Sequence, residues 1–183
     1  MHISTIFLVG LILWYTGLVN PKKQKIFDVM KFSSCSEYPD LPILLSLNRK
    51  RVYGKNNKTL ELTFLVKREI GGKLEGNMSV WKCGSSGAPD SCEYFVKDLK
   101  VKKLCEKIPM KNQMWTLLVE GFDPPLDCPI KAHSYEVKAP YQEEILKYLP
   151  VPGGVWKAKG FMYSDDQTVV CIDFEGKIVE RSV

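Results

Sequence analysis

The sequence has almost no histidine and lacks the short motifs that mark many enzymes. Only His2 and His133 occur in 183 residues, and no Cys-x-x-Cys pair is present. Zinc sites usually combine closely spaced cysteines with histidines, so these absences argue against a metal centre. Gly-x-Ser-x-Gly is also missing, as is a glycine-rich loop followed by Lys-Ser or Lys-Thr. The chain therefore has neither a hydrolase nucleophile elbow nor a phosphate-binding loop.

Few residues remain as candidates for catalysis. A Ser-His-Asp site would have to use His133, which precedes Tyr135 by two residues in a predicted strand. The aspartates at 123, 127, 165 and 166 stand in turn-like segments, where aspartate is common for backbone reasons. We therefore predict a binding protein and not an enzyme, with no cofactor and no metal.

Charge is absent from the beginning of the chain, where the first lysine is Lys22. Residues 3–19 form an uncharged apolar run, and the polar segment Asn-Pro-Lys-Lys-Gln-Lys follows. This pattern predicts a secretory signal peptide over residues 1–19, cut between about Gly17 and Lys22, and a single secreted domain over 20–183. A transmembrane anchor is the alternative, although a comfortable span needs about 20 residues.

Six cysteines follow the predicted signal, and an even number in an oxidising compartment indicates three disulfides. Export also agrees with two glycosylation sequons, which begin at Asn57 and Asn77. The net charge of +5 favours anionic lipid or glycan surfaces, with an ordinary solvated surface as the alternative. A secreted chain has no reason to bind nucleic acid.

Apolar residues alternate with polar ones in several segments after the signal. In residues 60–67 (LELTFLVK), one face carries Leu60, Leu62, Phe64 and Val66. Segments 114–121, 155–162 and 169–176 are interpreted in the same way as strands, and clusters of Gly, Pro, Asn and Asp separate them. Seven side chains are predicted to face the interior: Leu62, Phe64, Trp115, Leu117, Trp156, Met162 and Ile172.

One segment has a different spacing. Residues 139–150 (APYQEEILKYLP) place apolar side chains at helical intervals between Pro140 and Pro150. A short helix that begins at Pro140 is one interpretation, and a packed loop is the other. The whole pattern predicts an all-β fold of two antiparallel sheets, a sandwich or cup with at most one short helix.

The C-terminal half resembles a known family. The segments DCPIKAHSYEV (127–137), LPVPGGVWKAKG (149–160) and SDDQTVVCIDFEGKI (164–178) resemble ganglioside-activator-like proteins of the ML lipid-recognition superfamily. They are most similar to its insect chemosensory B branch. Two earlier segments, FDVMKFSSCSE (27–37) and SVWKCGSSGAPDSCEYF (79–95), agree more loosely.

The resemblance implies a fold, a cysteine pairing and a ligand site. The pairs would be Cys35–Cys171, Cys83–Cys92 and Cys105–Cys128. The two sheets would splay into a β-cup, whose apolar cavity the seven inward residues would line. The activators have two further cysteines that brace the region between 105 and 128, and these have no counterpart here.

The function implied is that of a secreted carrier for a lipid or hydrocarbon ligand in pheromone perception. One alternative is a lysosomal-type activator that presents a glycolipid to a hydrolase. Another is a secreted protein-protein interaction module with a filled core, and an esterase-like enzyme that uses His133 comes third. The expected partners are an apolar small molecule or lipid, and also a membrane surface or a receptor.

Overall fold

The described part of the chain consists of two antiparallel sheets. The computed structural model describes residues 23–53, 57–113, 115–141 and 152–182. The larger sheet has five strands, in the order β1 (Lys23–Ser34), β9 (Gln167–Ser182), β8 (Gly154–Ser164), β4 (Leu74–Cys83) and β5 (Glu93–Val101). The smaller sheet has four, in the order β2 (Ile43–Tyr53), β3 (Asn57–Val66), β7 (His133–Tyr141) and β6 (Phe122–Asp123). The all-β prediction is confirmed, while the predicted signal peptide lies outside the described residues.

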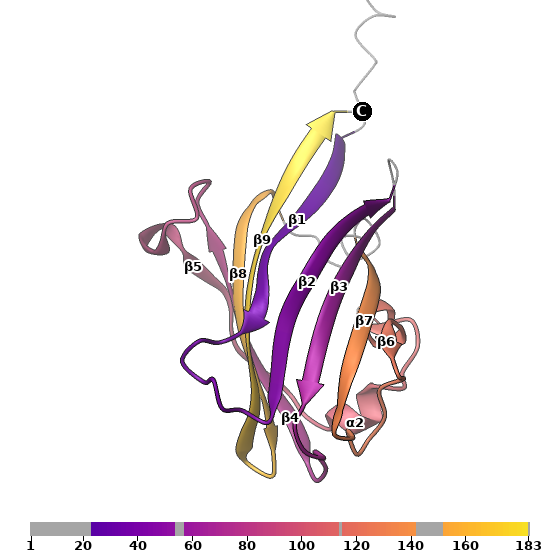
Figure 1. The fold of residues 1–183 in the computed structure, drawn as a ribbon. Coiled ribbons are helices and arrows are strands. Elements are labelled where there is room, and N and C mark those ends of the chain that lie inside the picture. The colour runs from indigo at the N-terminus through magenta and orange to yellow at the C-terminus, as the bar shows by residue number, and fades with distance from the viewer. Residues whose placement is uncertain (1–22, 54–56, 114, 142–151, 183) are drawn as a thin grey trace, which may run out of the picture.

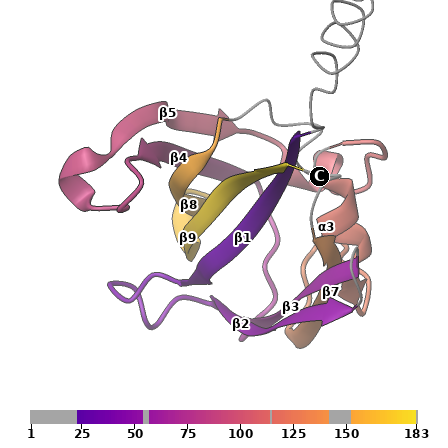
Figure 2. The same cartoon turned by 90° about the horizontal axis from the view of Figure 1, so that it is seen from above.

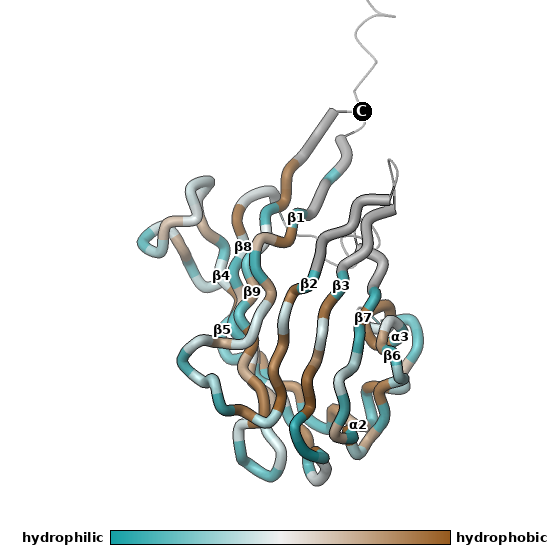
Figure 3. The backbone as a smooth tube through the Cα atoms, in the orientation of Figure 1, coloured by the Kyte–Doolittle hydropathy of each residue, from teal (hydrophilic) through white to brown (hydrophobic). Residues whose placement is uncertain are grey.

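The two sheets face each other and approach most closely on one side. On that side β1 and β9 contact β2 (Figures 1 and 2). The chain crosses from the larger sheet to the smaller one directly after β1. The strands β4 and β5 form the opposite side of the larger sheet, remote from β2 (Figure 2). Strong hydrophobic colouring follows β2 and β3 in Figure 3.

The alternating segments form strands because alternate side chains point to opposite faces of a sheet. In β3, Leu62 and Val66 are buried while Leu65 between them is exposed, as the pattern predicts. Phe64 lies on the same face as Leu62 and packs against the core. The segments over 155–162 and 169–176 likewise form β8 and β9, which pair along their length.

The prediction of a strand over 114–121 is wrong, because α3 (Thr116–Glu120) occupies this segment. A second short helix, α2 (Leu104–Lys107), precedes it, and η1 (Pro89–Ser91) is a single 3-10 turn. Five of the eight residues in 114–121 are apolar, and they stand at both odd and even positions, so periodicity alone does not distinguish a strand from a helix. Packing decides instead, since Leu118 of α3 contacts the core. The sequence predicted at most one short helix, at another place.

The segment from Pro140 to Pro150 begins differently from the predicted helix. Pro140 and Tyr141 are the last residues of β7, and the remainder lies outside the described residues. The strand tolerates this proline because β6 pairs only with Glu136 and Val137, which leaves β7 as an edge strand beyond them.

The main hydrophobic core lies at one end of the sandwich and joins both sheets. It contains the start of β2 and β7, the end of β3, and the start of β4 and β9. Ile70 and Ile130, which are joined by a β-bridge, close this end and are almost fully buried. The core residues are Ile43, Leu45, Leu62, Val66, Ile70, Leu74, Phe122, Ile130, Tyr135, Val137, Val169 and Val170.

Three disulfides hold the sheets and loops together. The pairs are Cys35–Cys171, Cys83–Cys92 and Cys105–Cys128, which match the pairing implied by the resemblance and leave none of the six cysteines free. The first connects the end of β1 to β9, and the second closes the loop that contains η1. The third connects α2 to the segment before β7.

Candidate functional site

The inner face of the larger sheet is apolar along β8 and β9. The register places Trp156 opposite Gly176, Ala158 opposite Phe174, and Gly160 opposite Ile172. Because residues two apart share a face, Trp156 and Met162 also point to this side of β8. Met162 and Ile172 pack against the core that includes Leu62, so this face is the one directed toward the smaller sheet.

Several of these inward side chains are only partly buried. Phe32, Leu47, Phe64, Met162 and Ile172 all contact the core and still keep accessible surface. In a sandwich whose centre is filled by side chains, such residues would be packed to the density of a protein interior. These side chains therefore lie at the border of the core and not inside it.

The accessible apolar surface increases toward the β4–β5 side. Met78 pairs with Gly160 on β8 and with Leu99 on β5, so all three share the inner face. Met78 retains 37% of its surface and Leu99 retains 45%. This side of the larger sheet has apolar side chains that no described residue covers completely, as an entrance for an apolar ligand would require.

Trp156 lies on the same inner face, but outside the described core cluster. Its side chain is 5% exposed, and Nε1 donates a hydrogen bond to the Pro152 carbonyl at 3.1 Å. The ring of Phe95 stands edge-on to it, with centroids 5.0 Å apart, and Phe95 itself is 54% exposed. Sequence reasoning missed Phe95, because irregular pairing of β4 with β5 shifts the register around Val80 and disturbs the simple alternation.

The seven predicted inward residues fall into three groups. The structure brings Leu62, Phe64, Met162 and Ile172 together at the core. Trp156 is farther along the same face, as described above. Trp115 and Leu117 belong to the α3 segment, where the indole Nε1 of Trp115 donates to the Lys107 carbonyl at 3.0 Å. That these residues line a ligand cavity stays a prediction.

The outer face of the larger sheet is polar and crossed by ion pairs. Lys157, which alternation predicts to point away from Trp156, is 30% exposed and donates to the Gly87 carbonyl at 2.8 Å. Lys159 contacts Glu37 at 2.8 Å, and Lys31 contacts Asp173 at 3.1 Å. The Lys159 hydrogen bond lowers the pKa of Glu37, and the same bond raises the pKa of Lys159. The Lys159–Glu37 pair joins β8 to the loop after β1, and the Lys31–Asp173 pair joins β1 to β9.

The candidates for catalysis or metal binding do not assemble into a site within the described residues. His133 begins β7, is exposed, and has its ring 5.3 Å from that of Tyr135. Ligand atoms of Cys35, Glu37 and Asp173 lie within 4.8 Å of one another. However, Cys35 is in a disulfide and each carboxylate contacts a lysine, so this group offers no metal site.

The two sequons lie on different sheets. Asn77 is in the middle of β4, on the outer face, while Asn57 is the first residue of β3 and its side chain lies outside the description. None of the helices in the described ranges is long and apolar enough to cross a membrane.

Comparisons with known proteins give only a weak structural likeness. No family model matches the chain, and no curated protein matches it. Among solved structures, a Niemann-Pick type C2 protein from the Japanese carpenter ant is similar, with 13% identity and a TM-score of 0.32. The match covers 87% of this chain and 95% of that one. Values this low establish neither a family nor a function.

Proposed function

We propose that the protein is a secreted carrier that holds a lipid or hydrocarbon-like ligand between its two sheets and performs no chemistry of its own. The observation that carries this proposal is the accessible apolar surface on the inner faces, from Phe64 and Ile172 toward Met78 and Leu99. An apolar chain placed against these residues would provide the packing that the protein side chains leave incomplete.

Burial of hydrocarbon supplies enough free energy for such a role without specific polar contacts. Each methylene removed from water contributes about 0.8 kcal/mol, so a chain of about twelve gains roughly 10 kcal/mol. Loss of translational and conformational freedom offsets several kcal/mol of that gain. The expected affinity is moderate, as suits a carrier that must also release its ligand.

The proposed location is extracellular, with a lysosomal lumen as the alternative. Three disulfides support an oxidising compartment, and the uncharged apolar run before Lys22 supports entry into the secretory pathway. The resemblance of residues 127–178 to chemosensory B proteins supports a pheromone-like hydrocarbon as the ligand.

The direct test is extraction of the secreted, purified protein with organic solvent, followed by mass spectrometry and by titration with a fluorescent fatty acid. We expect a co-purifying apolar molecule and saturable binding of the probe. Phe64→Ala should weaken that binding several-fold, because Phe64 is inward and partly accessible. Leu65→Ala is the matched control, since its side chain is 42% exposed on the opposite face of the same strand.

The proposal fails if the protein yields no apolar molecule and does not bind the probe. A tight protein partner found for such a ligand-free protein would favour the interaction module with a filled core.

A further inference from the structure

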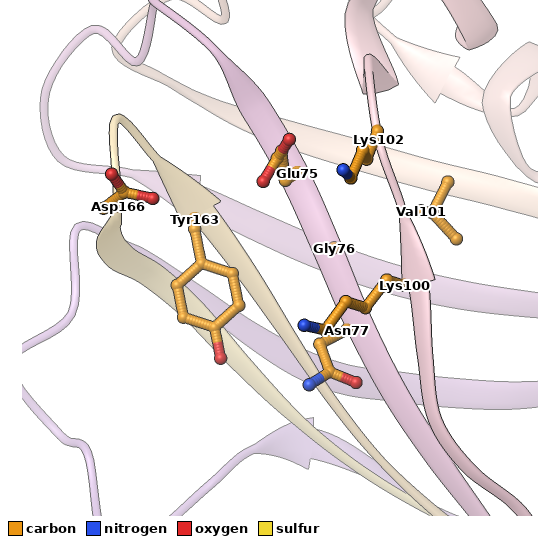
Figure 4. Close-up of a pocket in the computed structure, with 8 residues that line it drawn as sticks. All are labelled: Glu75, Gly76, Asn77, Lys100, Val101, Lys102, Tyr163 and Asp166. Atoms are coloured by element: carbon orange, nitrogen blue, oxygen red, sulfur yellow. The ribbon is translucent and has the colours of Figure 1, made fainter.

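A small cleft on the outer face of the larger sheet is lined by Asn77, the asparagine of the second sequon. Its volume is about 280 Å³, and strands β4, β5 and β8 and the β8–β9 turn all contribute to it (Figure 4). Six of its lining residues are polar: Glu75, Asn77, Lys100, Lys102, Tyr163 and Asp166. The cleft is on the face opposite to the proposed ligand site, because Asn77 and Met78 are neighbours in β4 and point to opposite sides.

The carboxamide of Asn77 lies at the wall of the cleft (Figure 4). The Oδ1 atom is buried and has no hydrogen-bond partner. Asn77 lines the cleft, and Figure 4 shows Nδ2 on the side of Tyr163. This nitrogen is the atom to which an N-linked sugar is attached.

The cleft has one aromatic wall. Tyr163 of β8 lines it, and its ring is stacked on Phe161 with centroids 6.3 Å apart and planes at 21°. Phe161 in turn stands edge-on to Tyr38, at 5.9 Å. These contacts restrain the phenol ring, which can pack against the C–H face of a sugar and keep its hydroxyl near water.

The other walls carry both hydrogen-bond donors and acceptors. Lys100 and Lys102 are exposed, and neither has an acidic partner within ion-pair distance among the described residues. Glu75 Oε1 lies 3.0 Å from Lys73 Nζ, and this contact raises the pKa of Lys73. The other carboxylate oxygen of Glu75 is left for other donors. Ammonium donors and a carboxylate acceptor around a ring face match the hydroxyl groups of a neutral sugar better than they match a simple anion.

We propose that Asn77 carries an N-linked glycan and that its first sugar residue occupies this cleft, packed on Tyr163 and hydrogen-bonded to Lys100 and Glu75. In the attachment, a lipid-linked pyrophosphate oligosaccharide is the donor. The bond from sugar C1 to Asn77 Nδ2 forms, the bond from C1 to the pyrophosphate oxygen breaks, and Nδ2 loses one proton. This inference rests on the entry into the secretory pathway that the proposed function includes.

The position of Asn77 in the sheet directs an attached sugar toward the cleft. Asn77 lies in a strand that is hydrogen-bonded on both sides, to β8 and to β5, so an attached sugar has to lie along the outer face of the sheet. A cleft next to the attachment atom accommodates it there. The sugar would bridge β8 and β5 across β4 and should stabilise the sheet.

The test uses the Asn57→Gln variant, in which Asn77 is the only sequon left. The variant is secreted from insect cells in its glycosylated form and is refolded from bacteria in its sugar-free form. Glycopeptide mass spectrometry should find Asn77 occupied. The glycosylated form should melt at least about 2 °C higher than the sugar-free form, a shift that a few contacts can produce in a domain of this size.

Tyr163→Ala, made in the same two forms, separates packing in the cleft from a general effect of the glycan. If the sugar packs on the ring, the increase in melting temperature should be lost in this variant. Ser79→Ala is unsuitable for removing the sequon, because Ser79 Oγ accepts a hydrogen bond from the Asp98 backbone at 3.1 Å. Asn77→Gln serves instead as the non-glycosylated control made in insect cells.

Two results would overturn the inference. One is an unoccupied Asn77 in the secreted protein, and the other is an equal increase in melting temperature with and without the Tyr163 ring. Binding of the fluorescent fatty acid is measured on the same samples. A lipid-binding protein without the sugar rejects this inference alone, while a glycosylated protein that binds no lipid rejects only the carrier function.

Discussion

Trp156 and Lys157 are neighbours in β8 with opposite environments, and they allow a direct comparison of the two faces of the larger sheet. Trp156→Ala should lower the free energy of unfolding by about 3 kcal/mol, which is at the low end for a buried tryptophan. The loss is small because its partner Phe95 is half exposed and can move into the space. The substitution should also change the affinity for a fluorescent fatty acid. Urea unfolding and probe titration measure the two quantities.

Lys157→Ala is the control for that comparison. It removes the contact with the Gly87 carbonyl on the outer face and should cost less than about 1 kcal/mol, with probe binding unchanged. Trp156→Ala could instead lower the free energy of unfolding by the full amount expected for a filled core while the probe binds as before. That result would contradict the placement of Trp156 at a ligand.

The Glu37–Lys159 pair predicts a specific pH dependence. The hydrogen bond from Lys159 lowers the pKa of Glu37 in the folded protein. A carboxyl group with a depressed pKa contributes to stability above its unfolded pKa, and this contribution is lost as the pH falls through the lowered value. In Lys159→Met, the pKa of Glu37 should return upward toward the ordinary range for glutamate. Carbon NMR of the Glu37 carboxylate measures it, and identical titration curves in both proteins would count against the pair.

At the scale of elements, α3 is where sequence periodicity and structure disagree, and mutation can distinguish them. A strand would direct Leu117 inward together with Trp115, whereas the helix places Leu118 against the core. Leu118→Ala should therefore destabilise the protein by about 2 kcal/mol, near the lower limit for leucine because the side chain is only partly buried. Leu117→Ala should cost clearly less in the same urea unfolding experiment. The reverse order would support a strand.

The strands β3, β8 and β9 were predictable because each has a long run in which apolar and polar residues alternate. The period of two is a local property, so the sequence shows it without reference to the rest of the chain. The segment 114–121 has apolar side chains at both odd and even positions, so there the local pattern is ambiguous. Its short helix depends on what it packs against, which the local sequence does not contain.

At the scale of the whole molecule, the disulfides should contribute in the order of the loops they close. Cys35–Cys171 spans 136 residues and Cys83–Cys92 spans 9. On the chain-entropy account, replacing the first pair with serines should cost about 5 kcal/mol and replacing the second about 2.6 kcal/mol. Urea unfolding of the two double variants gives the comparison. Equal losses would show that strain or residual structure in the unfolded chain outweighs loop closure.

The sequence by itself determined the all-β class, the inner and outer faces of three long strands, and an even set of cysteines whose pairing followed from the resemblance. These features depend on residue type, spacing and order along the chain, so they can be predicted from the sequence without a structure. Trp156 and Lys157, for example, take opposite faces simply because they are adjacent in a strand.

Only the tertiary structure decided which apolar side chains meet and which surfaces stay open. Phe95 contacts Trp156 across the sheet, although they are far apart in the chain and irregular pairing hides the alternation near Phe95. The cleft at Asn77 likewise needs Tyr163 and Lys100, which come from strands on either side of β4. Such sites form where distant segments become neighbours, and strand order and register, which set that proximity, are properties of the folded chain as a whole.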